Sequence, residues 1–87
     1  MIRGKLGSGF EFELDDNIFD DFELVELFAK VAKNPIFIGD LAEKMLGTEQ
    51  KKALTEHLRD KSGKVRTSAM MNALSEIEKA IPAVKNS

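Results

Sequence analysis

The sequence contains no cysteine, only one histidine and no long hydrophobic run. Without cysteine there can be no disulfide, no thiolate zinc site and no cysteine nucleophile. A single histidine, His57, cannot form a histidine-rich metal site. No apolar stretch approaches the roughly 18 residues of a membrane-spanning helix, and the first ten residues lack the apolar centre of a signal peptide. These absences predict a cytoplasmic protein with no membrane contact.

The composition is that of one small globular domain. The chain has 87 residues, of which 43% are hydrophobic and 32% charged, and this is too apolar for a disordered chain. A domain of this size buries a modest fraction of its surface, so its stability should be marginal unless it assembles.

Charge is unevenly distributed along the chain. Residues 1–47 contain five Lys or Arg and ten Asp or Glu, a net charge of -5, whereas residues 48–87 contain eight and five, a net charge of +3. A dedicated nucleic-acid binder usually has a stronger basic excess. The opposite signs of the two halves predict contact between them, or head-to-tail association of copies into a homo-oligomer.

The hydrophobic pattern predicts a mostly α fold in a single domain. Residues 1–15 form a β element or extended arm, because FEFEL (10–14) alternates apolar and acidic residues and can pair with IRGKL (2–6) as a hairpin. Residues 16–81 form the helical core, and residues 82–87 a flexible tail. The core is predicted to be a compact bundle of about four helices.

Helix-capping and helix-breaking residues indicate where those helices begin and end. Asp16 or Asn17 can cap the first helix, and Asn34 followed by proline ends it. Gly47 is expected to end a short second helix, and Thr48 begins a third. A loop around Gly63 then leads to a fourth helix, which Thr67 or Ser68 caps, Pro82 ends, and Met70, Ala73, Leu74, Ile77 and Ile81 anchor in the core.

Catalytic chemistry has little support. The carboxylates of ELDD (13–16) and FDDFE (19–23) could in principle exchange protons, but acids at a predicted helix start stabilise the helix dipole, which is the favoured interpretation. His57 has no serine or cysteine partner in an identifiable motif, and the glycines of GKLGSGF (4–10) are not followed by the GK[ST] of a phosphate loop. We therefore expect no enzyme, cofactor or metal site.

A small DNA-binding regulator of the helix-turn-helix type is the alternative function. Basic residues that could contact phosphates lie between positions 51 and 66: Lys51, Lys52, Arg59, Lys61, Lys64 and Arg66. The following helix offers only Asn72 as a good base-reading side chain near its start, and the connector RDKSGKVR (59–66) is longer than the usual tight turn. A solvated helix face and a basic loop is the favoured interpretation.

Protein binding has the strongest support in the pattern. The first predicted helix is apolar over most of its circumference, and PIFI (35–38) adds three apolar side chains that point in different directions. A core that closes over one wide stripe is the simpler reading, but a surplus could hold another chain's amphipathic helix, and Met45, Met70 and Met71 would adapt to varied partners. The predicted partner-binding residues are Phe19, Phe22, Phe28, Ile36, Phe37 and Ile38.

Two segments carry a family resemblance. LAEKMLGTEQKKALTEHLRDKSGKVRTSAMMNALSEI (41–77) has an L-G-x-E-Q…L…H-L-R-D helix, a glycine loop and an A-M…A-L…I helix, and FEFELDDNIFDDFELVEL (10–27) precedes it as an acidic segment. Together they resemble the small tail assembly chaperones of tailed phages and prophages of Gram-positive hosts. Phe22 stands where those proteins often have tryptophan.

The resemblance implies a non-enzymatic role in the cytoplasm of a bacterial host. Such chaperones bind the long helical tape measure protein while the phage tail is built, and they help to recruit tail-tube subunits. Many are also made in a longer, frameshifted form, for which the end IPAVKNS (81–87) would be a tolerant position.

Overall fold

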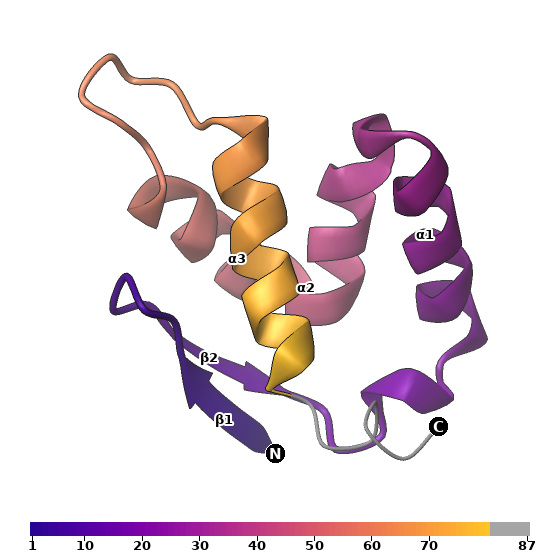
Figure 1. Cartoon of the computed structure of the whole chain (residues 1–87). Helices are drawn as coiled ribbons and strands as arrows, with labels where there is room; N and C mark the ends of the chain where they lie inside the picture. The colour runs from indigo at the N-terminus through magenta and orange to yellow at the C-terminus, as the bar shows by residue number, and fades with distance from the viewer. Residues whose placement is uncertain (81–87) are drawn as a thin grey trace.

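Within residues 1–80, three α-helices and a two-stranded hairpin make up the fold. The computed structural model describes residues 1–80. Strands β1 (Ile2–Lys5) and β2 (Glu11–Leu14) are followed by the 3-10 turn η1 (Ile18–Asp20), helix α1 (Phe22–Lys33), the 3-10 turn η2 (Pro35–Phe37) and helices α2 (Ile38–His57) and α3 (Thr67–Lys79) (Figure 1). The predicted mostly helical fold with an N-terminal hairpin is confirmed.

The prediction of four helices is wrong, because two of them are one bent helix. Gly47 adopts φ 80° and ψ 166° in the middle of α2, so the chain turns sharply there. Helix resumes without a loop, and the Thr48 hydroxyl donates a hydrogen bond back to the Glu43 carboxylate instead of acting as a separate start signal. The predicted interruption of regular helix at Gly47 is therefore confirmed, but it is a kink inside α2 and not the end of a separate helix.

The expected starts of the first and last helices also need correction. Asp21, not Asp16 or Asn17, caps α1: its Oδ1 accepts hydrogen bonds from the N–H groups of Glu23 at 3.0 Å and Leu24 at 3.4 Å. Helix α3 begins at Thr67 itself, with no side-chain cap bond, and it ends at Lys79. The expected core contact of Ile81 and the helix end expected at Pro82 lie outside the described residues.

The core lies where β2, η1 and the three helices meet. The largest fully buried side chains are Leu14, Leu24, Leu54 and Ile77, one each from β2, α1, α2 and α3. The apolar stripe predicted for the last helix is buried at all four of its described positions. Each element therefore contributes one apolar face to a shared interior, as its sequence pattern requires.

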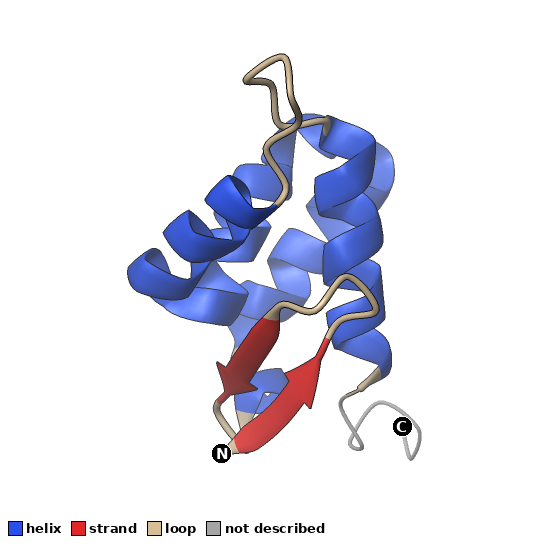
Figure 2. Ribbon diagram, turned by 90° about the vertical axis from the view of Figure 1, so that its left-hand side faces the viewer, coloured by secondary structure: helices blue, strands red, loops and turns tan. Residues whose placement is uncertain are grey.

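The hairpin lies against the helices (Figure 2), and polar contacts attach it through β2 and through its turn. The Gln50 side chain of α2 accepts from the Glu13 N–H at 2.7 Å and donates to the Glu13 carbonyl at 2.7 Å, so it occupies the outer edge of β2. Near the hairpin turn, the Gly7 N–H donates to Glu76 of α3 at 2.7 Å. A short hairpin is marginal alone, so these contacts and its apolar face hold it in place.

Neither a membrane span nor a metal-binding cluster is evident in the described part of the chain. No helix within residues 1–80 is long and apolar enough to cross a bilayer. No group of three or more potential ligands there is arranged to hold a metal ion.

Candidate protein-binding groove

Helix α1 is apolar on two adjacent sides, and only one of them is buried. Leu24 is fully buried, and Leu27, Phe28 and Val31 are half-buried against the core. Beside this inner stripe runs an exposed one with helical spacing: Phe22, Val25, Ala29 and Ala32. Phe22 is 73% exposed and Val25 46% exposed. The apolar arc of α1 is therefore wider than its contact with the core.

The inner and outer stripes of α1 meet at an apolar groove of about 260 Å³. Helix α1 forms one wall through Phe28, Val31 and Ala32. The first half of α2 supplies the floor through Ile38 and Leu41. Helix α3 forms the other wall through Met71, Leu74, Ser75 and Glu78. The two wall helices stand on either side of the first half of α2 (Figure 1).

The opposite side of α1 is charged and engages α2 through ion pairs. Lys44 of α2 lies 3.1 Å from Glu23 and 3.3 Å from Asp21. Its hydrogen bonds to Glu23 and Asp21 raise the pKa of the Lys44 ammonium above its usual value. Partial desolvation opposes the effect at Asp21, but Lys44 and the capping N–H groups lower the pKa of that carboxyl. These contacts fix α1 against α2 while leaving the groove side apolar.

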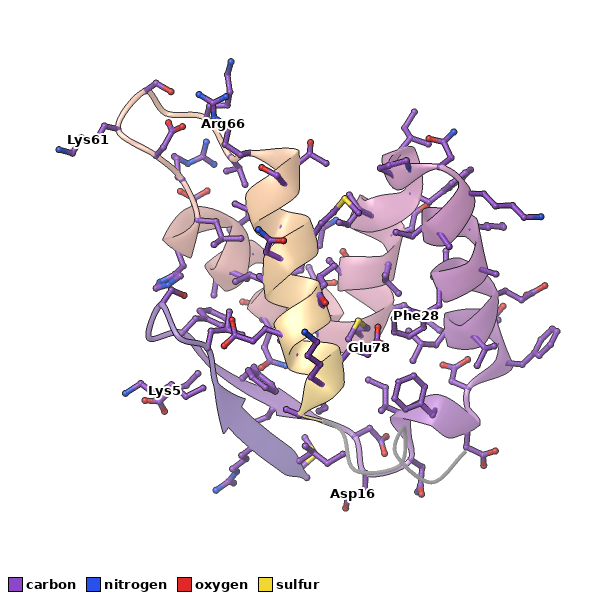
Figure 3. All side chains as sticks on the ribbon, in the orientation of Figure 1. Lys5, Asp16, Phe28, Lys61, Arg66 and Glu78 are labelled. Carbon is purple, nitrogen blue, oxygen red and sulfur yellow. The ribbon has the colours of Figure 1, made fainter. Side chains whose placement is uncertain are left out.

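Two of the six predicted partner-binding residues line the groove, and a third supports it. Phe28 and Ile38 are half-buried in its wall and floor. Phe19 of η1 stacks on Phe28 with ring centroids 5.6 Å apart. Phe19 thus supports the Phe28 ring that bounds the groove; Phe28 is labelled on α1 in Figure 3.

The other three predicted residues lie elsewhere on the surface. Phe22 belongs to the exposed stripe at the start of α1, and Ile36, 77% exposed, belongs to η2 beyond the end of α1. Phe37 is half-buried beneath the Lys30 ammonium, 5.6 Å from the ring centroid. The structure therefore divides the predicted set between the groove, the outer stripe and the η2 corner.

Most of the α3 wall was not predicted from the sequence. Met71 was expected only as an adaptable side chain, and no role was expected for Ser75 or Glu78. All three lie on one side of α3, at spacings of three and four residues. A helical projection places them beside the buried stripe, and this signal could have found them.

The basic residues of the alternative function do not form a free cluster. Lys51 lies 3.4 Å from Glu43, Arg59 pairs with Glu56, and Arg66 lies 3.4 Å from Asp60. Lys52, Lys61 and Lys64 are exposed. Half of the proposed phosphate contacts are thus already engaged with carboxylates.

The connector between α2 and α3 is organised around the Asp60 carboxylate. Its Oδ1 accepts hydrogen bonds from the Ser62 hydroxyl, from the Ser62 N–H at 2.9 Å and from the Lys64 N–H at 3.0 Å. The Ser62 hydroxyl and the Lys64 N–H lower the pKa of Asp60 below its usual 3.8. The loop that contains Lys61 and Arg66 projects away from the groove (Figure 3).

Comparisons with protein-family models, curated proteins and solved structures find no match to this chain.

Proposed function

We propose that this protein is a binding module whose groove receives an amphipathic helix of another protein, and that it serves as a tail assembly chaperone for a phage tape measure protein. The observation that carries the proposal is the groove between α1 and α3, together with the exposed apolar stripe that continues from it around α1.

The arrangement of the helices supports a helical occupant. Helices α1 and α3 stand on either side of the first half of α2 (Figure 1), and the groove between them is lined mostly by apolar side chains. Burying a helix there would complete a common packing arrangement. Helix-in-groove recognition depends on apolar side chains spaced three and four residues apart.

The sequence resemblance suggests which protein the groove binds, here called the client: a tape measure protein. A tape measure protein exposes long apolar helix faces before the tail tube encloses it. Many copies of a small module could cover those faces, and each weak contact would gain from its neighbours on the same chain. A tail-tube subunit is the second proposed partner, for which the exposed Phe22 and Ile36 remain available.

The test measures binding of the tape measure protein to variants that place a charge in the groove. Ala32 is exposed and lines the groove, so Ala32→Glu should leave the fold intact while placing a carboxylate against the client. Ala29→Glu is the matched control, because Ala29 is exposed on the same helix but does not line the groove. Met71→Glu with Asn72→Glu as its control repeats the comparison on α3.

We expect Ala32→Glu and Met71→Glu to weaken client binding about tenfold or more, since a carboxylate would have to be buried against the apolar stripe of the client. The two control variants should bind as the wild-type protein does. Equal binding by all four variants, with unchanged circular dichroism, would show that the groove is not the client site.

A further inference from the structure

The apolar groove contains a single charged side chain within the described part of the chain, the Glu78 carboxylate. Glu78 is half-buried on the last turn of α3 and faces the same space as Phe28 (Figure 3). No hydrogen bond or ion pair to another residue of the range 1–80 satisfies it. Glu76, two residues earlier, is by contrast bonded to the hairpin at Gly7.

A helix that docked in the groove would remove more water from Glu78. Removing water from an ionised carboxylate without giving it a partner is strongly unfavourable, and a cationic partner offsets much of that cost. The other lining residues are apolar except for Ser75 and cannot supply positive charge. No described residue that lines the groove can therefore pair with Glu78, and a cation on the occupant would do so.

The geometry points to an occupant helix whose apolar stripe is bordered by a lysine or arginine that pairs with Glu78. This inference rests on the proposed function, because it takes the groove as the binding site, and it adds the charge that the client must present. Glu78 would then select among apolar helices: it favours those with basic borders and rejects those with acidic borders.

Two synthetic peptides test the inference without knowledge of the client's sequence. Both are about 14 residues long, which matches the roughly 20 Å length of α3, and both have the same leucine stripe. One has lysine at every position bordering the stripe, and the other has glutamate there, so neither register nor direction needs to be assumed. Calorimetry measures the Kd of each peptide for the full chain and its variants.

The control variant separates a local pair from overall charge. Glu78→Lys and Glu49→Lys change the net charge equally, but Glu49 is exposed and does not line the groove. We expect the wild-type protein and Glu49→Lys to prefer the lysine peptide by about tenfold. Glu78→Gln should lose most of that preference, and Glu78→Lys should abolish or reverse it.

Each remaining outcome contradicts a distinct claim. If Glu78→Lys and Glu49→Lys discriminate equally while both peptides bind, the role of Glu78 is wrong and the groove remains a helix site. If neither peptide binds the wild-type protein at concentrations up to about 1 mM, helix recognition by the groove is wrong as well. Dimerisation that Ala32→Glu abolishes would assign the groove to a second copy and overturn the inference.

Discussion

At the scale of single residues, the contacts that sequence could not predict are those between positions far apart in the chain. Gln50 reads as one more polar residue on a helix, yet its side chain covers the edge of a strand 37 residues away. Glu78 reads as a solvated acid near a helix end. In both cases the residue type and helix face were clear from the sequence, but the neighbouring element was not.

Gly4 of β1 leaves room for the ring of Phe12, its partner residue in β2. A Cβ atom at Gly4 would lie 2.5 Å from Cζ of Phe12, whose ring is buried opposite it in the hairpin. Gly4→Ala should therefore lower the free energy of unfolding by about 1–3 kcal/mol, the usual cost of overpacking. Urea denaturation of the wild-type and variant proteins measures this change in the free energy of unfolding.

A double-mutant cycle identifies the cause. If the clash with the ring is responsible, Gly4→Ala should cost less in a Phe12→Leu background than in the wild-type protein. Equal costs in the two backgrounds would attribute the loss to the strand backbone instead.

At the scale of elements, periodicity predicted the type of structure better than its boundaries. The alternation of FEFEL indicated the strand Glu11–Leu14, and the spacing of apolar residues indicated the buried face of α3. The acidic segment before α1 was harder, because several of its residues can cap a helix. Ile18 is buried in a separate 3-10 turn, and α1 begins only at Phe22, later than the sequence predicted. The burial of Ile18 depends on the assembled core, which the local sequence does not reveal.

The bend in α2 depends on a backbone conformation that favours glycine at position 47. Gly47 combines φ 80° with ψ 166°, a region that side-chain-bearing residues avoid, and nothing lies within 4 Å of where its Cβ would be. Gly47→Ala should thus destabilise the protein through backbone strain alone, by about 1–3 kcal/mol. Thermal or urea unfolding measures the change.

Gly39 is the matched control in the same helix. It has no positive φ, and nothing lies within 4 Å of the position that a Cβ atom would take there. Gly39→Ala should leave stability unchanged or raise it by up to about 1 kcal/mol through helix propensity. A loss at Gly39 equal to that at Gly47 would contradict the strain argument.

At the scale of the whole molecule, the sequence indicated a surplus of apolar surface but not its location. The wide apolar arc of α1 was evident from spacing alone. The groove lies between α1 and α3, which both pack on α2, and α2 is bent at Gly47 before the 58–66 connector leads to α3. Phe28 and Ile38 were foreseen because they belong to that arc and to the segment that follows it, whereas the α3 wall was not.

Exposed acidic and basic residues gather at different ends of the folded molecule (Figure 3). Asp16 lies at one end and the loop containing Lys61 and Arg66 at the other (Figure 3). Asp15, Asp16 and Asp20 are all exposed, as are Lys61 and Lys64. Because the acidic end and the basic end lie on opposite sides of the molecule, the acidic end of one copy can contact the basic end of the next. Such a head-to-tail contact is heterologous and can repeat from copy to copy.

We therefore expect light scattering at low salt to give a mass above the 9.7 kDa of one chain, and we expect that mass to fall as salt screens the exposed charges. The double variant Lys61→Glu with Lys64→Glu should remain a monomer at every salt concentration. Adding Asp15→Lys and Asp16→Lys to the same chain would exchange the signs of both ends and should restore association. If the wild-type protein stays monomeric at low salt, there is no electrostatic head-to-tail contact. If it forms an oligomer that neither salt nor these variants affect, the contact is not electrostatic, and apolar surfaces such as those of Phe22 and Ile36 are the basis of self-association.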